Sequence, residues 1–144
     1  MCEGAQEVFE MMVGVAVESC DADPTLQPGE FTAVIGVAGP INGVFSIRCD
    51  DAAACGIASG MLGVEGQEAR AEAWDALGEV CNMVIGSFKR KTGKLGASSV
   101  LSIPTVIYGH DYKVRPLARG CTLICHMKSP DGRVELRLDY KLSS

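Results

Sequence analysis

The stretch Glu79-Val80-Cys81-Asn82-Met83-Val84-Ile85-Gly86 recurs in altered form 72 residues earlier, as Glu7-Val8-Phe9-Glu10-Met11-Met12-Val13-Gly14. Glutamate, valine, methionine and glycine agree in register, but Glu10 stands where the later copy has Asn82. Both copies have apolar residues at helical spacing. We therefore expect two equivalent helices in a pseudo-symmetric domain, of which only the later one carries an amide beside its carboxylate.

The rest of the chain predicts helices and antiparallel strands. Helices are expected over 5–19, over 67–91 and, capped by Asp50 and Asp51, from there to Leu62. Strands are expected over 31–37, 44–47, 99–101, 105–108, 117–127 and 134–142, with turns at Gly39-Pro40, Asn42-Gly43 and 129–132. These elements predict an α+β fold with long helices packed on an antiparallel β-sheet.

Two further matches extend the repeat beyond the helices. Val34-Ile35 and Val106-Ile107 share the 72-residue offset, and residues 43–47 loosely match 120–124. We interpret residues 1–144 as one pseudo-symmetric domain with an internal repeat over approximately 5–63 and 67–142. The alternative is that two amphipathic helices agree by chance.

Composition excludes several classes of protein. With 144 residues, 47% of them hydrophobic and 22% charged, the chain is typical of one soluble globular domain. The net charge of -5 and the lack of a basic run longer than Lys89-Arg90-Lys91 argue against nucleic acid as a partner. No apolar run is long enough to cross a membrane, and residues 1–4 do not resemble a signal peptide. We expect a cytoplasmic protein whose seven scattered cysteines are free thiols.

Cys121, Cys125 and His126 are the residues that most resemble metal ligands. They lie in an expected strand, where residues four apart are separated by roughly 13 Å. One tetrahedral ion cannot span that distance. We therefore predict no metal site and interpret these thiols as packing groups.

A narrow polar stripe follows one side of the helix expected over 67–91. Helical spacing places six residues on this stripe: Asp75, Gly78, Glu79, Asn82, Gly86 and Lys89. Glycine inside a helix costs roughly 1 kcal/mol relative to alanine, so two glycines call for a reason. Gly78 and Gly86 would let another surface approach the helix, with Glu79 and Asn82 projecting toward it. The alternative is an ordinary solvated face.

The spacing of these residues is similar to a known signature. Asp75-x-x-x-Glu79-x-x-Asn82, followed by Met83-Val84-Ile85-Gly86, resembles the motif of the CheC/CheX/FliY family of chemotaxis phosphatases. The segments 7–12 and Ile103-Pro104-Thr105-Val106-Ile107-Tyr108-Gly109 also resemble CheX-type sequence, so the resemblance covers nearly the whole chain. In this family, CheC-type members tend to carry two intact motifs and CheX-type members one. Glu10 therefore groups the chain with CheX, which implies a CheC/CheX-like fold.

The resemblance implies an aspartyl-phosphate phosphatase that acts on a CheY-like response regulator. Asn82 would orient the attacking water, Glu79 would anchor the partner through its lysine, and Asp75 would extend the acidic contact. The chain has no phosphate-binding glycine loop and no evident nucleophile. The phosphorylated receiver would therefore supply the acyl phosphate and a divalent ion, expected to be Mg²⁺, and the chain would need no cofactor of its own.

Other interpretations of the sequence stay open at this stage. The chain could bind a receiver without hydrolysing it, or serve as a structural part of a larger signalling or motor complex. A small-molecule enzyme that uses a cysteine is a third alternative, although no cysteine has an evident activating histidine or lysine. The resemblance also implies a homodimer that forms through the sheets. The strand over 134–142 offers an edge for it, but the alternating charges of that strand could equally protect the edge.

Overall fold

The computed structural model describes residues 18–19, 31–110, 112, 114, 120–129 and 132–143. Two β-hairpins form the centre of its sheet: β2 (Phe31–Ala38) with β3 (Ile41–Cys49), and β6 (Cys121–Ser129) with β7 (Gly132–Leu142). β3 pairs with β7 from Ile41 opposite Leu142 to Cys49 opposite Val134, which joins the two hairpins. The short strands β4 (Val100–Leu101) and β5 (Thr105–Tyr108) both pair with the outer side of β2.

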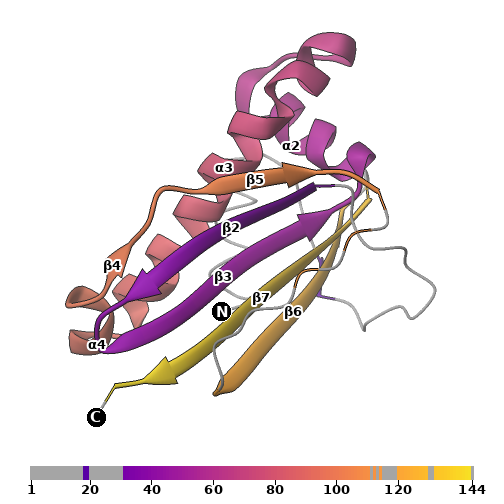
Figure 1. The fold of residues 1–144 in the computed structure, drawn as a ribbon. Helices are drawn as coiled ribbons and strands as arrows, with labels where there is room; N and C mark the ends of the chain where they lie inside the picture. Colours follow the sequence, from indigo (N-terminus) through magenta and orange to yellow (C-terminus); the bar gives the residue numbers. More distant parts are fainter. Residues whose placement is uncertain are drawn as a thin grey trace.

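Helices cover one face of this antiparallel sheet (Figure 1). They are α2 (Asp51–Leu62), α3 (Gly66–Lys91) and the short α4 (Lys94–Ala97). Alternate residues of the strands point toward the helices, so that Phe45, Ile47 and Leu136 are fully buried. Leu77 and Val80 of α3 join the same core. The predicted α+β class, with helices packed on an antiparallel sheet, is confirmed.

Local chemistry explains where the two main helices begin and end. Asp50 caps α2, because its Oδ1 accepts a hydrogen bond from the Ala53 amide at 2.7 Å. Gly63 ends α2 in the left-handed conformation at φ 68°. In α3, three basic residues occupy the last turn, where the helix dipole favours positive charge. The expected helices 51–62 and 67–91 are confirmed to within one residue.

Several expectations about local structure are wrong. Glu18 and Ser19, expected in a helix, form the strand β1 (Glu18–Ser19), which pairs with β6. The rest of the helix expected over 5–19 lies outside the described residues. Asn42 and Gly43 belong to β3 rather than to a turn. Gly43 is needed for another reason: a Cβ there would lie 2.8 Å from the Cα of Tyr140 on β7, which real side chains do not tolerate.

The sheet order bears on the expected internal repeat and corrects the expected edge strand. Val34-Ile35 and Val106-Ile107 lie on β2 and β5, which are hydrogen-bonded neighbours in the sheet. The repeat itself stays a prediction. β7 is not an edge strand, because β3 and β6 pair with its two sides. The proposed association through the C-terminal strand therefore has no free edge there, and the homodimer stays a prediction.

The cysteines differ from the expectation in one respect. Cys49, Cys55, Cys81 and Cys121 are free. Cys125 is disulfide-bonded, so the expectation of seven free thiols is wrong at that position. Within the described ranges, no three His, Cys, Asp or Glu side chains come together as metal ligands would. None of the described helices is both long enough and apolar enough to span a membrane.

Candidate functional site

Helix α3 presents the predicted stripe on a largely buried scaffold. Its inner face is packed against the sheet and α2 by ten buried residues, among them Leu77, Val80 and Val84. Asp75 and Glu79 are exposed, and Asn82 is half-buried. The helix is therefore held firmly from below, while its acidic and amide side chains lie at the surface.

Glu79 and Asn82 are neighbours on this surface. Residues three apart on a helix have Cβ atoms about 5–6 Å from each other. Among the described residues, neither side chain takes part in a hydrogen bond or ion pair. An amide that offers both a donor and an acceptor thus stands beside a carboxylate, and both are available to groups outside the chain.

The segment that contains β4 and β5 runs antiparallel to α3 and forms a wall beside the site (Figure 1). At one end, Leu101 lines a pocket together with Lys89. At the other end, the Tyr108 ring lies 5.8 Å from the Trp74 ring, and the Tyr108 hydroxyl accepts a hydrogen bond from Arg70 at 3.3 Å. The wall therefore lies beside α3 from Trp74 to Lys89, a stretch that includes Asn82.

Gly78 belongs to this wall contact rather than to an open surface. It is buried, and a Cβ built on it would lie 3.6 Å from both Pro104 and Val106. The close approach that we expected from a partner is made here by the chain's own β4–β5 segment. The sequence alone does not reveal this, because the segment is distant along the chain.

Gly86 and Lys89 lie on the open part of the helix. A Cβ on Gly86 would meet only the Arg90 side chain, at 3.6 Å. Both residues line a shallow groove of about 470 Å³, together with Arg90, Gly93, Ala97 and Leu101. The stripe therefore continues beyond Asn82 as an accessible surface with basic residues at its end.

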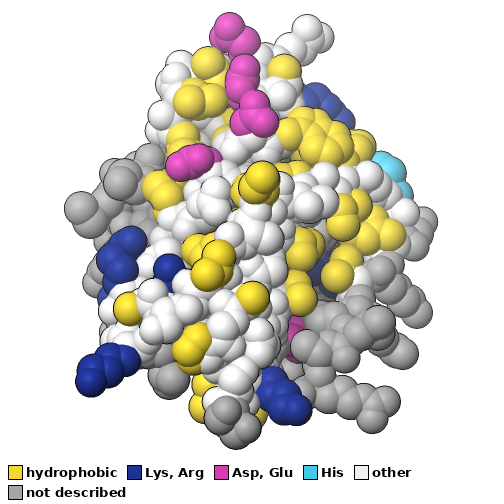
Figure 2. All heavy atoms as spheres, turned by 60° about the vertical axis from the view of Figure 1, so that its left-hand side comes forward, with side chains coloured by type: hydrophobic (Ala, Val, Ile, Leu, Met, Phe, Trp, Pro, Cys, Tyr) yellow, Lys and Arg dark blue, Asp and Glu magenta, His cyan; other side chains and the backbone are white. Residues whose placement is uncertain are grey.

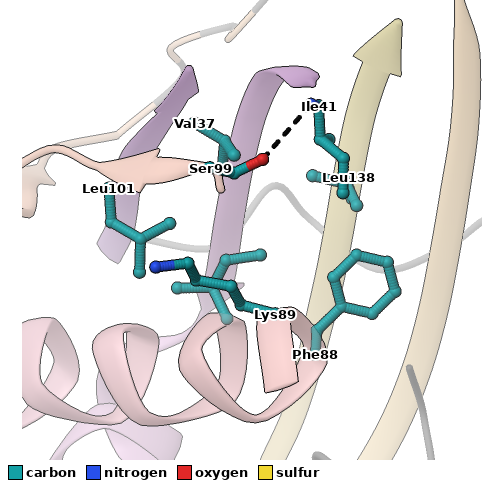
Figure 3. A pocket seen from close by; sticks show the side chains of 8 residues that line it. Val37, Ile41, Phe88, Lys89, Ser99, Leu101 and Leu138 are labelled. Atoms are coloured by element: carbon teal, nitrogen blue, oxygen red, sulfur yellow. Dashed lines mark hydrogen bonds between the residues drawn. The ribbon is translucent and has the colours of Figure 1, made fainter. Parts of the chain in front are cut away.

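A small apolar pocket lies beneath the same end of the helix. Its volume is about 10 Å³, which is near the lower limit for one water molecule. In Figure 3 the Lys89 stem runs along this pocket and its ammonium nitrogen points toward Leu101, while the Ser99 hydroxyl accepts a hydrogen bond from the Ile41 amide. The pocket is a packing feature that supports α3 and is too small for a ligand.

The thiol nearest the motif is not a nucleophile. Cys81 is fully buried on the core side of α3, with its Sγ 3.8 Å from the Ala33 carbonyl oxygen. Burial raises the pKa of the Cys81 thiol to about 12, which leaves almost no thiolate at neutral pH. Burial also raises the pKa of Cys49. The alternative of a cysteine enzyme therefore has no support from these two residues.

The surface around the motif carries charge and apolar groups that the sequence did not single out. Figure 2 shows acidic side chains at the upper end of this face and hydrophobic ones along its middle. Ile103, immediately before Pro104, is 86% exposed, and Trp74 is 42% exposed. The sequence gives no local sign that Ile103 is exposed, because its neighbours Val100, Leu101, Val106 and Ile107 are also apolar. Its position beside α3 depends on the fold.

Comparison with known proteins identifies the family and relatives with the same fold. The model of the family "Chemotaxis phosphatase CheX" matches residues 31–128. The chain is similar to the chemotaxis protein CheX from Vibrio vulnificus, with 25% identity, a TM-score of 0.83 and coverage of 96% of this chain and 92% of that one. A putative chemotaxis protein from Desulfovibrio vulgaris Hildenborough is 23% identical, with a TM-score of 0.84 and coverage of 97% and 93%.

A third similar structure is a complex. It is described as CheX-CheY-BeF3-Mg from Borrelia burgdorferi, and it is 22% identical, with a TM-score of 0.73 and coverage of 96% and 94%. A search of the curated proteins finds no match. Because the family model matches more than half of the 144 residues, the chain belongs to the CheX family of chemotaxis phosphatases.

Proposed function

We propose that this protein accelerates hydrolysis of the phosphoaspartate of a CheY-like receiver domain, with Asn82 orienting the attacking water and Glu79 anchoring the partner. One observation carries the proposal. An unbonded amide and an unbonded carboxylate stand side by side on a helix that is rigidly packed from below. Such a pair has no structural task within the described part of the chain.

Asn82 is suited to positioning rather than to covalent chemistry. Its Oδ1 can accept a hydrogen bond from a water, and its Nδ2 can donate one to the water or to a phosphoryl oxygen. The water oxygen then attacks phosphorus opposite the aspartyl oxygen, a P–O bond forms, and the bond to the aspartate breaks with the electron pair leaving on the carboxylate. The proton lost by the water passes to the phosphate or to solvent. A neutral amide serves other phosphoryl transfers in the same way.

The receiver completes the site in this proposal. A divalent ion and a lysine held by the receiver would neutralise charge on the phosphoryl oxygens. Glu79, which is exposed, can pair with that lysine. Asp75 stands one turn earlier and extends the acidic contact, while Gly86 and Lys89 line the open groove beyond Asn82. We place this reaction in the cytoplasm.

The comparisons support a receiver as the partner. The family model is named for a phosphatase, and one similar structure contains CheY together with CheX. The chain's own geometry adds that the described residues bring no metal-binding cluster to the motif. A partner that carries its own metal and phosphoryl group fits a surface of this kind.

Phosphate release tests the proposal directly. Receiver domains from the same cell are phosphorylated with a small-molecule phosphodonor, the donor is removed, and loss of phosphate is followed with and without this protein. We expect at least one receiver to lose phosphate faster in its presence. A receiver that binds the protein but loses phosphate at its own rate would identify a non-catalytic binding module instead.

A further inference from the structure

Ile103 stands out because an aliphatic side chain that large is rarely so exposed at a fixed position. It is 86% exposed, the highest value among the described large hydrophobic residues. Its backbone neighbours are held in place on both sides. The Ser102 amide donates to the Gly36 carbonyl at 2.9 Å, and the Gly36 amide donates to the Ser102 hydroxyl at 2.8 Å. These bonds attach the segment to β2.

Pro104 fixes the other side of Ile103. A proline restricts the residue before it to extended conformations. Pro104 itself packs on α3 at Gly78, where an added Cβ would be in van der Waals contact with it. Ile103 therefore projects from a short, doubly anchored segment. A side chain presented in this way loses little freedom when a partner covers it.

Ile103 lies beside α3 at about the level of Asn82, the amide to which we assign the orientation of water. Leu101 lies level with Gly86 and Lys89, whose groove it shares, and Pro104 lies level with Gly78. Ile103 is between them on the wall, and Asn82 is midway between Gly78 and Gly86 on the helix. Four helical residues rise about 6 Å, so Ile103 is within one or two turns of Asn82.

From this placement we infer that Ile103 is a docking residue for the receiver, seated in an apolar depression beside the phosphorylated aspartate. The inference rests on the proposed function. A partner whose phosphoryl group comes within hydrogen-bonding distance of Asn82 must also cover the adjacent wall. Glu79 lies on the other side of Asn82, so the amide is flanked by one charged and one apolar contact.

The test compares three variants in the phosphate-release assay with the receiver that the wild type dephosphorylates fastest. Ile103→Ser should raise the half-saturating receiver concentration about tenfold, because an apolar side chain no longer leaves water on binding. The maximal rate should stay within about twofold, and thermal unfolding should be unchanged. Ile103→Leu should restore affinity.

Leu62→Ser is the matched control. Leu62 is also an exposed aliphatic residue, at 52%, but it ends α2 next to the start of α3. The start of α3 is 16 residues from Asn82, or roughly 24 Å. This variant should behave as the wild type does.

Each outcome has a distinct meaning. Wild-type affinity and turnover in Ile103→Ser would overturn the inference and leave the proposed function intact. If Ile103→Ser keeps its receiver affinity but has a different native mass from the wild type when no receiver is present, Ile103 belongs to a contact between copies of this chain. That result would also overturn the inference. If the wild type accelerates phosphate release from no receiver, the proposed function fails and the docking role fails with it.

Discussion

At the scale of single residues, adjacent positions of α3 differ sharply in burial. Cys81 is fully buried and its thiol pKa is raised to about 12, whereas Asn82 reaches the surface without a hydrogen bond in the described part of the chain. One residue of helix turns the side chain by about 100°. The proposed mechanism therefore uses the exposed carboxylate and the half-buried amide rather than the thiol between them.

The anchoring role proposed for Glu79 predicts a change in affinity without a change in fold. Glu79→Gln removes the charge but keeps the shape, so the half-saturating receiver concentration should rise about tenfold while thermal unfolding stays the same. Glu72→Gln is the matched control, since Glu72 is also exposed on α3 but lies two turns earlier. A lower melting temperature in Glu79→Gln would instead make Glu79 a structural residue.

At the scale of elements, the important arrangement is α3 with the β4–β5 segment beside it. The segment covers Gly78 and leaves Gly86 open. Both glycines lack a side chain on the same stripe, yet only Gly86 remains available to a partner. The two positions therefore offer a matched pair for separating stability from docking.

Alanine at either glycine should keep or increase stability. An added methyl group at Gly78 or Gly86 meets its nearest atom at 3.6 Å, and alanine is favoured over glycine in a helix by about 1 kcal/mol. We expect urea unfolding to show a gain of up to about 1 kcal/mol for each. Only Gly86→Ala should slow dephosphorylation, because it fills the surface that the receiver approaches. Equal activity in both variants would remove Gly86 from the docking surface.

Some features of these elements can be predicted from the sequence and others cannot. The boundaries of α2 and α3 are predictable because Asp50, Gly63 and the basic last turn of α3 are local signals. The exposure of Asp75 and Glu79 follows from helical periodicity alone. The burial of Gly78 and the position of Ile103 are not predictable, because both depend on a segment about 25 residues later that folds back along the helix. Asn42-Gly43 wrongly predicts a turn, because both residues belong to β3. Gly43 is needed there because β7 passes too close to leave room for a side chain.

At the scale of the whole molecule, long-range strand pairing decides features that no local pattern reveals. From the sequence, the alternating charges of β7 could protect the edge of a sheet. In the structure β7 is not an edge, because β3 and β6 flank it. Arg137 donates to Asp139 at 2.8 Å, and the Thr122 hydroxyl on β6 donates to the same carboxylate at 2.7 Å. These groups connect the two strands of one hairpin across the surface.

This arrangement predicts a dependence of stability on pH. Burial alone would raise the pKa of Asp139, but the hydrogen bonds from Arg137 and Thr122 outweigh it and lower the pKa. A carboxylate with a lowered folded pKa stabilises the protein above its unfolded pKa of about 3.9, and this contribution is lost as the pH falls through the folded value. Arg137→Met should therefore lower the free energy of unfolding at pH 7 and have a smaller effect below about pH 3.

Lys141→Met provides the control for that measurement. It removes one positive charge from the same strand, at an exposed position that forms no ion pair with a carboxylate among the described residues. Urea unfolding at several pH values should show a pH-dependent gap from the wild type for Arg137→Met and a nearly constant one for Lys141→Met. A gap for Arg137→Met that is equally large at pH 3 and pH 7 would contradict the role assigned to Asp139.

The most direct test of the central claim is phosphate release by Asn82→Ala. Asn82 is half-buried and unbonded within the described residues, so the variant should fold and should bind the phosphorylated receiver with nearly wild-type affinity. Without the amide that orients the water, its acceleration of dephosphorylation should fall by about a hundredfold or more. An Asn82→Ala protein that binds the receiver and dephosphorylates it as fast as the wild type would contradict the account.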